Sequence, residues 1–290
     1  TAAAARLGRH RDRRRRTRRR VESLVGSHSA AECSRVAARL SRRRNVALTV
    51  GAFAEWQNAS MVLRKLDAPY SRMEAWVYDR FIADAVHTAT SGLLDEVAAM
   101  APPGGHLLDI GCGGGHFSLA LAERADQCRV TGIDLSPQQV ARARTRARAQ
   151  PAGVASRVEF DVGTALELPF PDNNFDAAVS VGSIKHWPDR GRGVEEMVRV
   201  VKPGGRVTIV ELDRDAPRPA LLAWAARLGV PRPFRVAFAR AFARLITDPS
   251  IGVEEGRRLL MGTDLQDVKA QSDNEFPFVT LSGIIGRSGR

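Results

Sequence analysis

Residues 107–115, Leu-Leu-Asp-Ile-Gly-Cys-Gly-Gly-Gly, constrain the fold of this chain more than any other segment. The apolar run is typical of a strand buried on both faces, and residues 116–123 have the spacing of a helix that packs on a sheet. Glycine lets the loop adopt backbone angles closed to other residues and leaves the main chain open to a ligand. The segment therefore predicts a strand, tight loop and helix that hold a nucleotide-like ligand.

A second apolar run, residues 129–134, ends in Asp134. A carboxylate at this position can accept hydrogen bonds from ribose hydroxyls, and both dehydrogenases and methyltransferases place an acid there. Asp109, two residues before the first loop glycine, separates these classes. A nearby carboxylate disfavours a bound pyrophosphate, whereas a sulfonium cofactor with a free amino group tolerates one.

The pattern Asp109-x-Gly111-x-Gly113-x-Gly115 resembles the first motif of class I S-adenosylmethionine-dependent methyltransferases. Residues 168–180, 186–189 and 201–207 follow in the order found in the branch that contains the ubiquinone and menaquinone biosynthesis methyltransferases. The similarity runs from about Met73 to the C-terminus.

This resemblance implies S-adenosyl-L-methionine as the cofactor. Asp109 and the glycines would hold its methionine portion, Asp134 would hold its ribose, and Leu135 would pack against its adenine. The implied cofactor-binding residues are Asp109, Gly111, Cys112, Gly113, Gly115, Asp134, Leu135, Thr164, Ala165 and Ser180.

Adenine recognition departs from the family pattern. In the family an acid commonly follows the glycine after the third strand, but here Gly163 is followed by Thr164. A threonine hydroxyl can still form a hydrogen bond, without a charge. Asp161 is a candidate substitute, and a strand-end acid that only meets solvent is the competing interpretation.

Residues 180–187, at the end of the fourth predicted strand, would face the methyl group of the cofactor. They lack the Asp/Asn-Pro-Pro-Tyr/Phe sequence of enzymes that methylate nucleic-acid amines, so we expect a small-molecule acceptor. His186 is the candidate catalytic base, because its ordinary pKa suits proton removal at neutral pH. Alternatively, His186 and Trp187 only pack and hydrogen-bond the loop.

The alternation of elements predicts an α/β fold: a Rossmann-like, doubly wound sheet, mostly parallel, with helices on both faces and an antiparallel last strand. The expected division is a disordered Arg-rich tail over residues 1–44, a helical N-terminal cap over 45–105 and the cofactor-binding domain over 106–290. The strands are expected near residues 106–111, 129–134, 157–162, 175–181 and 205–212, the helices near 115–124, 137–149 and 193–202, and a final hairpin over 264–285.

Residues 213–249 predict a helical lid insert, because they combine apolar side chains such as Trp224 and Phe242 with several arginines. Such a lid would cover a hydrophobic acceptor, with an anionic acceptor as an option. The alternative is a pair of ordinary amphipathic helices whose arginines are solvated. The arginines are Arg227, Arg232, Arg235, Arg240 and Arg244.

The net charge of +12 lies entirely in residues 1–44, which hold 15 Lys and Arg against 3 Asp and Glu, whereas the rest holds 29 of each. The excess of positive charge and the shortage of apolar residues in this tail predict disorder. It fits an arm for nucleic acid or an anionic membrane, an organelle transit peptide, or a non-native extension ahead of Met61.

No apolar run suits a membrane span or a secretory signal, so cytoplasmic residence is expected. Three cysteines indicate neither a disulfide framework nor a metal site.

We therefore expect an S-adenosylmethionine-dependent enzyme that methylates oxygen or carbon of a small, hydrophobic acceptor. Two alternatives stay open. One is an NAD-dependent oxidoreductase, which Asp109 and residues 168–207 disfavour. The other is a catalytically inactive Rossmann-type protein that its basic tail tethers to nucleic acid or a membrane.

Overall fold

The structure of the chain, a computed structural model, describes residues 90–228, 230, 232–243, 250–273 and 276–287. The chain divides into two units, Thr1–Ala68 and Pro69–Arg290, and every described residue lies in the second. The predicted tail and most of the predicted N-terminal cap therefore lie outside the described residues. So does Arg244 of the predicted lid.

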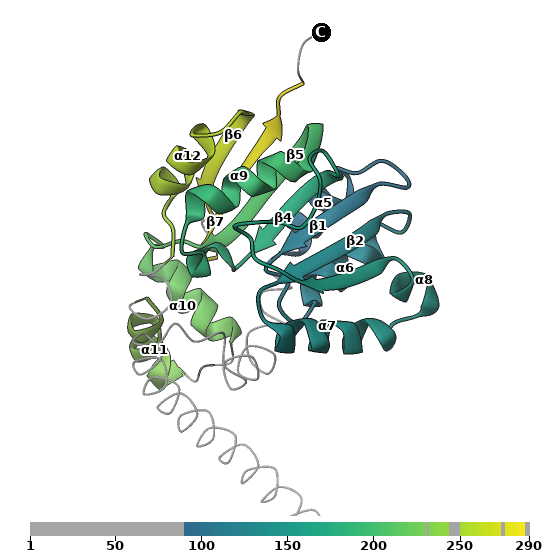
Figure 1. The fold of residues 1–290 in the computed structure, drawn as a ribbon. Coiled ribbons are helices and arrows are strands. Elements are labelled where there is room, and N and C mark those ends of the chain that lie inside the picture. The colour runs from purple at the N-terminus through teal and green to yellow at the C-terminus, as the bar shows by residue number, and fades with distance from the viewer. Residues whose placement is uncertain (1–89, 229, 231, 244–249, 274–275, 288–290) are drawn as a thin grey trace, which may run out of the picture. The chain divides into compact units, whose positions relative to one another are not determined.

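A seven-stranded sheet forms the centre of the described part, in the order β3-β2-β1-β4-β5-β7-β6 (Figure 1). Strands β1 to β5 are parallel, and β7 pairs antiparallel with both β5 and β6. This confirms the predicted, mostly parallel sheet with an antiparallel last strand. The strands are β1 His106–Ile110, β2 Arg129–Asp134, β3 Val158–Val162, β4 Phe175–Val181, β5 Val201–Leu212, β6 Leu265–Ser272 and β7 Phe278–Ile285.

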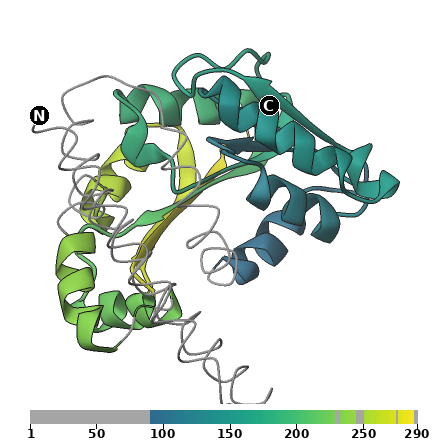
Figure 2. The same cartoon turned by 90° about the horizontal axis from the view of Figure 1, so that it is seen from below.

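Helices cover both sides of the sheet, as Figure 2 shows. The helices are α5 Ser91–Ala98, α6 His116–Arg124, α7 Pro137–Arg148, α8 Ala152–Ala155, α9 Arg190–Val200, α10 Arg218–Arg227, α11 Arg235–Phe242 and α12 Val253–Met261, with short 3₁₀ turns η2 Ile184–His186 and η3 Arg232–Phe234. Among the described residues, no helix has the length and apolar character needed to cross a bilayer.

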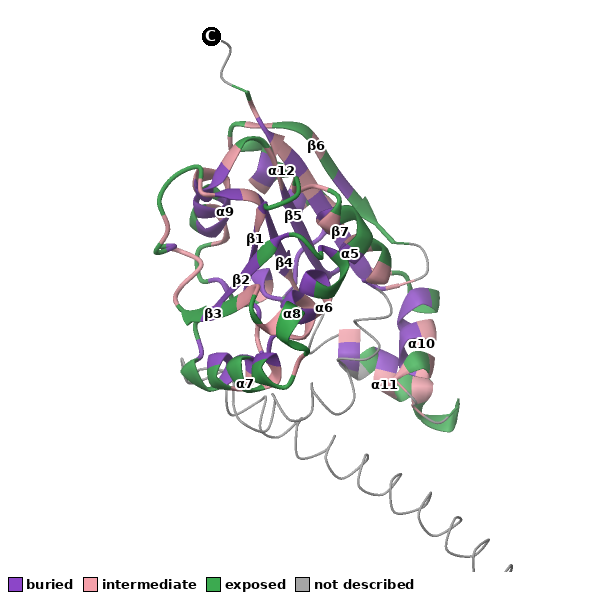
Figure 3. Cartoon of the chain, turned by 90° about the vertical axis from the view of Figure 1, so that its right-hand side faces the viewer, coloured by how far each residue is buried: buried purple, intermediate pink, exposed green. Residues whose placement is uncertain are grey.

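Strand β1 is buried on both faces, as its apolar run predicted. Leu108 packs in one core cluster with Met197 of α9, while Leu107 packs in another with Leu94 of α5 and Leu121 of α6. Figure 3 shows the same layering, with buried strands in the middle and helices that expose their outer sides. The glycine loop that follows β1 therefore begins at a strand that is packed on both faces.

Helix α9 begins before the predicted residue 193, at Arg190. The Asp189 side chain caps it by accepting a hydrogen bond from the backbone N–H of Arg192 at 2.9 Å. Gly193 stays inside the helix because it packs on Trp187, where a Cβ atom would lie 2.3 Å from the ring atom Cε3. Close packing thus outweighs the low helix propensity of glycine.

Strand β5 also begins earlier than predicted, at Val201 instead of near residue 205. Val201 pairs with Phe175, and the register shifts between Phe175 and Ala177 of β4. Gly204, with a φ of 83°, takes up the extra length. Gly204 and Gly205 therefore lie at an irregularity within the strand.

Glu196 of α9 anchors the segment that leads into β4. Its side chain is only 3% exposed. It accepts hydrogen bonds from the backbone N–H of Leu168 at 2.8 Å, from Arg192 at 3.0 Å and from Arg199 at 2.7 Å. The hydrogen bonds from Arg199 hold its pKa below the ordinary value, although burial opposes them.

We predict that Glu196→Ala lowers the free energy of unfolding by about 1–3 kcal/mol, because it leaves the backbone N–H of Leu168 without its acceptor and removes one of the acceptors of Arg192 and Arg199. Urea denaturation of the full chain measures this change. Glu195→Ala is the matched control: this neighbour is 59% exposed, and its removal should change the stability by less than about 0.5 kcal/mol. Equal effects of the two substitutions would contradict the anchoring role.

Candidate functional site

The loop between β1 and α6 contains three glycines with positive φ: Gly111 at 75°, Gly113 at 51° and Gly115 at 81°. A Cβ atom on Gly111 would lie 2.3 Å from Cβ of Ser183, and one on Gly115 would lie 2.8 Å from Cβ of Ala143. Among the described residues, a Cβ atom on Gly113 would meet only Nε2 of Gln139, at 3.9 Å. Gly111 and Gly115 are therefore packing positions, whereas the main chain at Gly113 is open to a ligand.

This loop is tied to the end of β2. The backbone N–H groups of Gly111 and Cys112 donate to the carbonyl oxygen of Ile133 at 2.8 and 3.1 Å. The Cys112 side chain is 8% exposed, and its burial raises the pKa of the thiol well above the ordinary value. Cys112 thus contributes a neutral side chain and a fixed backbone.

Asp134 at the end of β2 faces the same loop. Its Oδ2 atom accepts a hydrogen bond from the backbone N–H of Gly113 at 2.9 Å, and its Oδ1 atom accepts one from Ser136 at 2.8 Å. Burial raises the pKa of Asp134, and the two hydrogen bonds oppose that rise. The next residue, Leu135, leaves 68% of its surface exposed. A fixed carboxylate and an exposed apolar side chain therefore stand next to the open glycine.

Asp109 lies deeper, at 1% exposure. Its Oδ2 atom accepts a hydrogen bond from Oγ of Ser118 in α6 at 2.5 Å. Burial raises the pKa of Asp109 to about 7, and the negative charge of Asp134 adds to this rise. The carboxyl group is therefore partly protonated at neutral pH, and a nearby positive charge would favour its ionised form.

Gln139 in the first turn of α7 is a site residue that the sequence reasoning missed. It is 7% exposed, and its Oε1 atom is buried without a hydrogen-bond partner. The signal was present in the sequence, because Gln139 interrupts the otherwise apolar stripe that contains Ala143 and Ala147. The side chain of Gln139 thus approaches Gly113 with its Nε2 atom and keeps a buried acceptor, Oε1, to which a ligand could donate a hydrogen bond.

Thr164 and Ala165 reach the same edge of the sheet, since the backbone N–H of Gly163 donates to the carbonyl oxygen of Asp134 at 3.1 Å. Both residues are half-buried. The Thr164 hydroxyl accepts a hydrogen bond from the backbone N–H of Leu166 at 3.2 Å, so part of its capacity is used within the turn.

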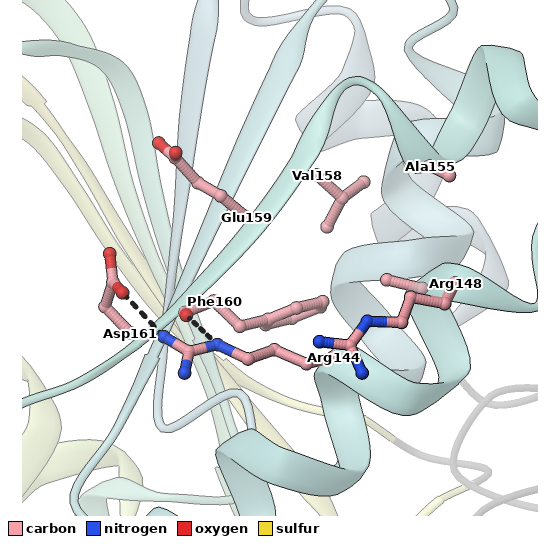
Figure 4. A pocket seen from close by; sticks show the side chains of 8 residues that line it. Arg144, Arg148, Ala155, Val158, Glu159, Phe160 and Asp161 are labelled. Atoms are coloured by element: carbon pink, nitrogen blue, oxygen red, sulfur yellow. Dashed lines mark hydrogen bonds and ion pairs between the residues drawn. The ribbon is translucent and has the colours of Figure 1, made fainter.

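Asp161 points elsewhere. It forms an ion pair with Arg144 of α7 at 2.9 Å, and Arg144 also donates to the carbonyl oxygen of Phe160 (Figure 4). These residues line an open pocket of about 330 Å³ between α7 and β3, and none of the glycine-loop residues lines it. The geometry thus favours the interpretation of Asp161 as a surface acid over a role in adenine binding.

The end of β4 is joined to the end of β1. Oγ of Ser180 lies 2.7 Å from Oγ of Ser183, and the Ser183 hydroxyl donates to the carbonyl oxygen of Ile110 at 3.1 Å. Gly182 has a φ of 68°, and a Cβ atom there would meet only Nζ of Lys185, at 3.8 Å. Gly113 and Gly182 are therefore two open backbone positions on neighbouring strand ends.

A buried ion pair connects the end of β4 to that of β5. Nζ of Lys185 lies 2.9 Å from Oε1 of Glu211, and the two side chains are 14% and 0% exposed. Lys185 also donates to the carbonyl oxygen of Gly182 at 2.6 Å. The sequence analysis missed both partners, although an acid at a buried position of an apolar strand was the available signal.

His186 follows in η2. Its side chain is exposed, but the protein atoms around it displace enough water to lower its pKa to about 4, with a further lowering from the charge of Lys185. The imidazole is therefore neutral at pH 7 and a weaker base than an ordinary histidine. Its assignment as the catalytic base stays a prediction.

The predicted lid contributes helices α10 and α11. Trp224 is 1% exposed and packs edge-on against Phe278, at a ring distance of 5.1 Å, within a cluster that includes Leu212 of β5. The indole N–H of Trp224 is buried without a partner. Arg227 lies 4.3 Å from the ring centre of Phe276, so at least this arginine covers an aromatic ring.

We predict different results for alanine at two glycines of the loop. Gly111→Ala should lower the free energy of unfolding by about 1–3 kcal/mol or more, because the new methyl group overlaps Ser183. Gly113→Ala should cost only about 1–2 kcal/mol of backbone strain, yet weaken binding of S-adenosylmethionine, the cofactor implied by the sequence, by about tenfold or more. Urea denaturation and calorimetry measure the two effects, and full affinity of a folded Gly113→Ala variant would contradict this picture.

The raised pKa of Asp109 predicts a stability change with pH. The folded protein keeps a proton that the unfolded chain releases between its ordinary pKa of 3.8 and about 7, so this group destabilises the fold as the pH rises through that window. Asp109→Asn should therefore gain stability relative to the wild type from about pH 4 to 7, by up to about 1.4 kcal/mol per pH unit. Chemical denaturation at several pH values tests this, with Asp126→Asn as an exposed control. Parallel stability curves for Asp109→Asn and the wild type would disprove the shift.

Comparison with known proteins gives a family for this site. Residues 108–209 match a family described as a methyltransferase domain. The chain is 43% identical over 123 residues to 27-O-demethylrifamycin SV methyltransferase of Amycolatopsis mediterranei (strain S699). This match covers 42% of this chain and 44% of the relative. It is 43% identical over 106 residues to ajmaline N-methyltransferase of Rauvolfia serpentina, covering 36% and 35%.

A third relative, the demethylmenaquinone methyltransferase of Desulfitobacterium hafniense (strain Y51), is 41% identical over 113 residues, covering 39% of this chain and 44% of the relative. The chain thus matches less than half the length of each of these relatives. A solved structure of a putative methyltransferase in complex with the Haloferax volcanii Trm112 activator has the same fold, with a TM-score of 0.56 and 19% identity over 77% of this chain and 100% of that one. Residues 108–209 therefore match a methyltransferase domain, which supports the resemblance to class I S-adenosylmethionine-dependent methyltransferases that the motifs predicted.

Proposed function

We propose that this protein binds S-adenosylmethionine and methylates oxygen or carbon of a small, hydrophobic acceptor. The cofactor supplies an electrophilic methyl group on a positively charged sulfur. The residues of the chain hold the reactants and exclude water, because such an in-line displacement depends mainly on alignment.

The open main chain at Gly113 is the observation that carries this proposal. Of the loop glycines with positive φ, it is the one at which a Cβ atom would enter free space, and it donates a hydrogen bond to Asp134. A carboxylate has lone pairs for further donors, so Asp134 can accept the ribose hydroxyls. The unpaired Oε1 atom of Gln139 adds a buried acceptor. The residues present therefore fit this cofactor.

The acidic surroundings favour a cationic ligand over a dinucleotide. Asp109 and Asp134 interact through their charges, and each has a raised pKa chiefly because of burial. A pyrophosphate near two carboxyl groups would be repelled, whereas a sulfonium and an amino group would stabilise their ionised forms. This supports S-adenosylmethionine over NAD.

The predicted lid would supply the apolar side of the acceptor site. Trp224 and Phe242 are buried beside Leu212 of β5, while Phe234 near the start of α11 keeps 46% of its surface exposed. An exposed aromatic side chain of this kind suits a hydrophobic ring or chain. His186 stays the candidate base, and its lowered pKa makes it better suited to an acceptor that is already acidic.

Two of the matched relatives are named for methylation at oxygen and at nitrogen. We favour oxygen or carbon because Lys185 borders the open space at Gly182 and presents only N–H donors, which suit an acceptor oxygen better than a protonated amine. Residence in the cytoplasm and an acceptor other than nucleic acid belong to the same proposal.

Calorimetry with S-adenosylmethionine, S-adenosylhomocysteine and NAD tests the cofactor. We expect the wild-type full chain to bind the first two and not NAD. Asp134→Ala should weaken their binding by about tenfold or more, since charge-assisted hydrogen bonds to the ribose are lost.

Two control variants make this test specific. Asp126→Ala removes an exposed acid ahead of β2 and should bind like the wild type. Asp161→Ala should also keep its affinity, and a loss there would assign adenine recognition to Asp161 instead. If a folded wild-type protein bound neither methionine-derived ligand, the enzyme proposal would fail and a scaffold role for the domain would replace it.

A further inference from the structure

The ion pair between Lys185 and Glu211 lies beside the open backbone position at Gly182. The carboxyl ends of β4 and β5 are neighbours, with Val181 paired to Val210, and the pair joins Lys185, in the turn after β4, to Glu211 in the last residues of β5. Glu211 also accepts hydrogen bonds from the backbone N–H groups of Lys185, at 3.3 Å, and Leu212, at 2.8 Å. The carboxylate is thus fully held inside the protein.

Burying this ion pair carries a large desolvation penalty if its role is only to hold the loop. Moving two charges out of water costs several kcal/mol for each ion, and an apolar pair of similar volume is often as stable. The loop already has other anchors, since Ser183 is bonded to Ile110 and the Ile184 side chain is fully buried. Anchoring alone therefore does not account for a buried ammonium group at this place.

The ammonium group borders open space. Nζ of Lys185 is the only atom that a Cβ atom on Gly182 would approach within 4 Å among those of the described structure, at 3.8 Å. Lysine has three N–H donors, and Glu211 and the Gly182 carbonyl oxygen each accept one. Among the described residues, one donor is thus left to bind a ligand.

We propose that Lys185, held in place by Glu211, binds the methyl acceptor through an oxyanion, so that the preferred acceptors are phenols or enols with an acidic hydroxyl. This inference rests on the proposed function and adds a residue and a substrate class to it. The charged groups around the oxyanion are Lys185 of η2 and Glu211 of β5, and the neutral imidazole of His186 follows Lys185 in the chain. Because Glu211 balances the charge of Lys185, the preference comes from a directed, charge-assisted hydrogen bond.

The chemistry balances without a further reactant. The acceptor hydroxyl loses its proton to water before transfer, and Lys185 stabilises the resulting oxyanion. The new oxygen–methyl bond then forms as the sulfur–methyl bond breaks. The product is a neutral ether that no longer pairs with the ammonium group, which favours its release.

The test measures the ionisation of a bound phenol. The probe is 4-nitrophenol, whose phenolate absorbs visible light, titrated with pH in the presence of the full-length protein saturated with S-adenosylhomocysteine. We expect binding to lower the apparent pKa of the probe by about one unit or more, as for an acid beside an opposite charge. Lys185→Met should abolish this shift, and Lys185→Arg should keep most of it. Lys269→Met is the control, because Lys269 forms an exposed ion pair with Asp267 in β6.

The wild-type protein alone can overturn the proposal, whatever the stability of the variants. An unshifted pKa of the bound probe, or no binding of the phenolate, would refute it. A shift that persists in Lys185→Met would do so as well. Because S-adenosylhomocysteine binding is measured separately, failure of the cofactor site is distinguished from failure of the acceptor site.

Discussion

The contact between Gly111 and Ser183 is the constraint on which the site depends. The sheet order reverses between β1 and β4, so the loops after these strands leave the same edge and diverge. The Ser183 hydroxyl joins the two loops by donating a hydrogen bond to the carbonyl oxygen of Ile110. The Ser183 side chain also occupies the space that a side chain at position 111 would need. This contact fixes the distance between the open backbone at Gly113 and that at Gly182. The proposed cofactor and acceptor sites would therefore be held by one rigid frame.

Charge is divided across this frame. Buried carboxyl groups, Asp109 and Asp134, lie on the side of β1 and β2, while Lys185 with its partner Glu211 lies on the side of β4 and β5. A positively charged methyl donor and a negatively charged acceptor would each meet the opposite sign. Their charges cancel as the methyl group moves, so a low-dielectric site is an advantage for the transfer.

The positions of β1, β2 and β4 could be predicted because each is a short apolar run, and the loop at Gly111 because glycine suits its backbone angles. Boundaries were less accurate where packing decided them, as at Gly193 against Trp187 and at the irregularity near Gly204. The partners of charged groups could not be predicted. Lys185 and Glu211 are 26 residues apart, and only the pairing of β4 with β5 brings them together. Gln139 was accessible in principle, as a polar residue in a buried helical stripe.

The packing of Trp224 in α10 has a consequence for the fluorescence of the protein. The indole N–H of Trp224 is buried among aromatic rings with no hydrogen-bond acceptor. An indole in such surroundings emits at short wavelength, and its emission moves to the red when an acceptor or water reaches the N–H group. Opening of α10, or contact of a polar ligand group with this indole, would therefore change the colour of the intrinsic fluorescence. The protein contains its own reporter of events beneath the lid.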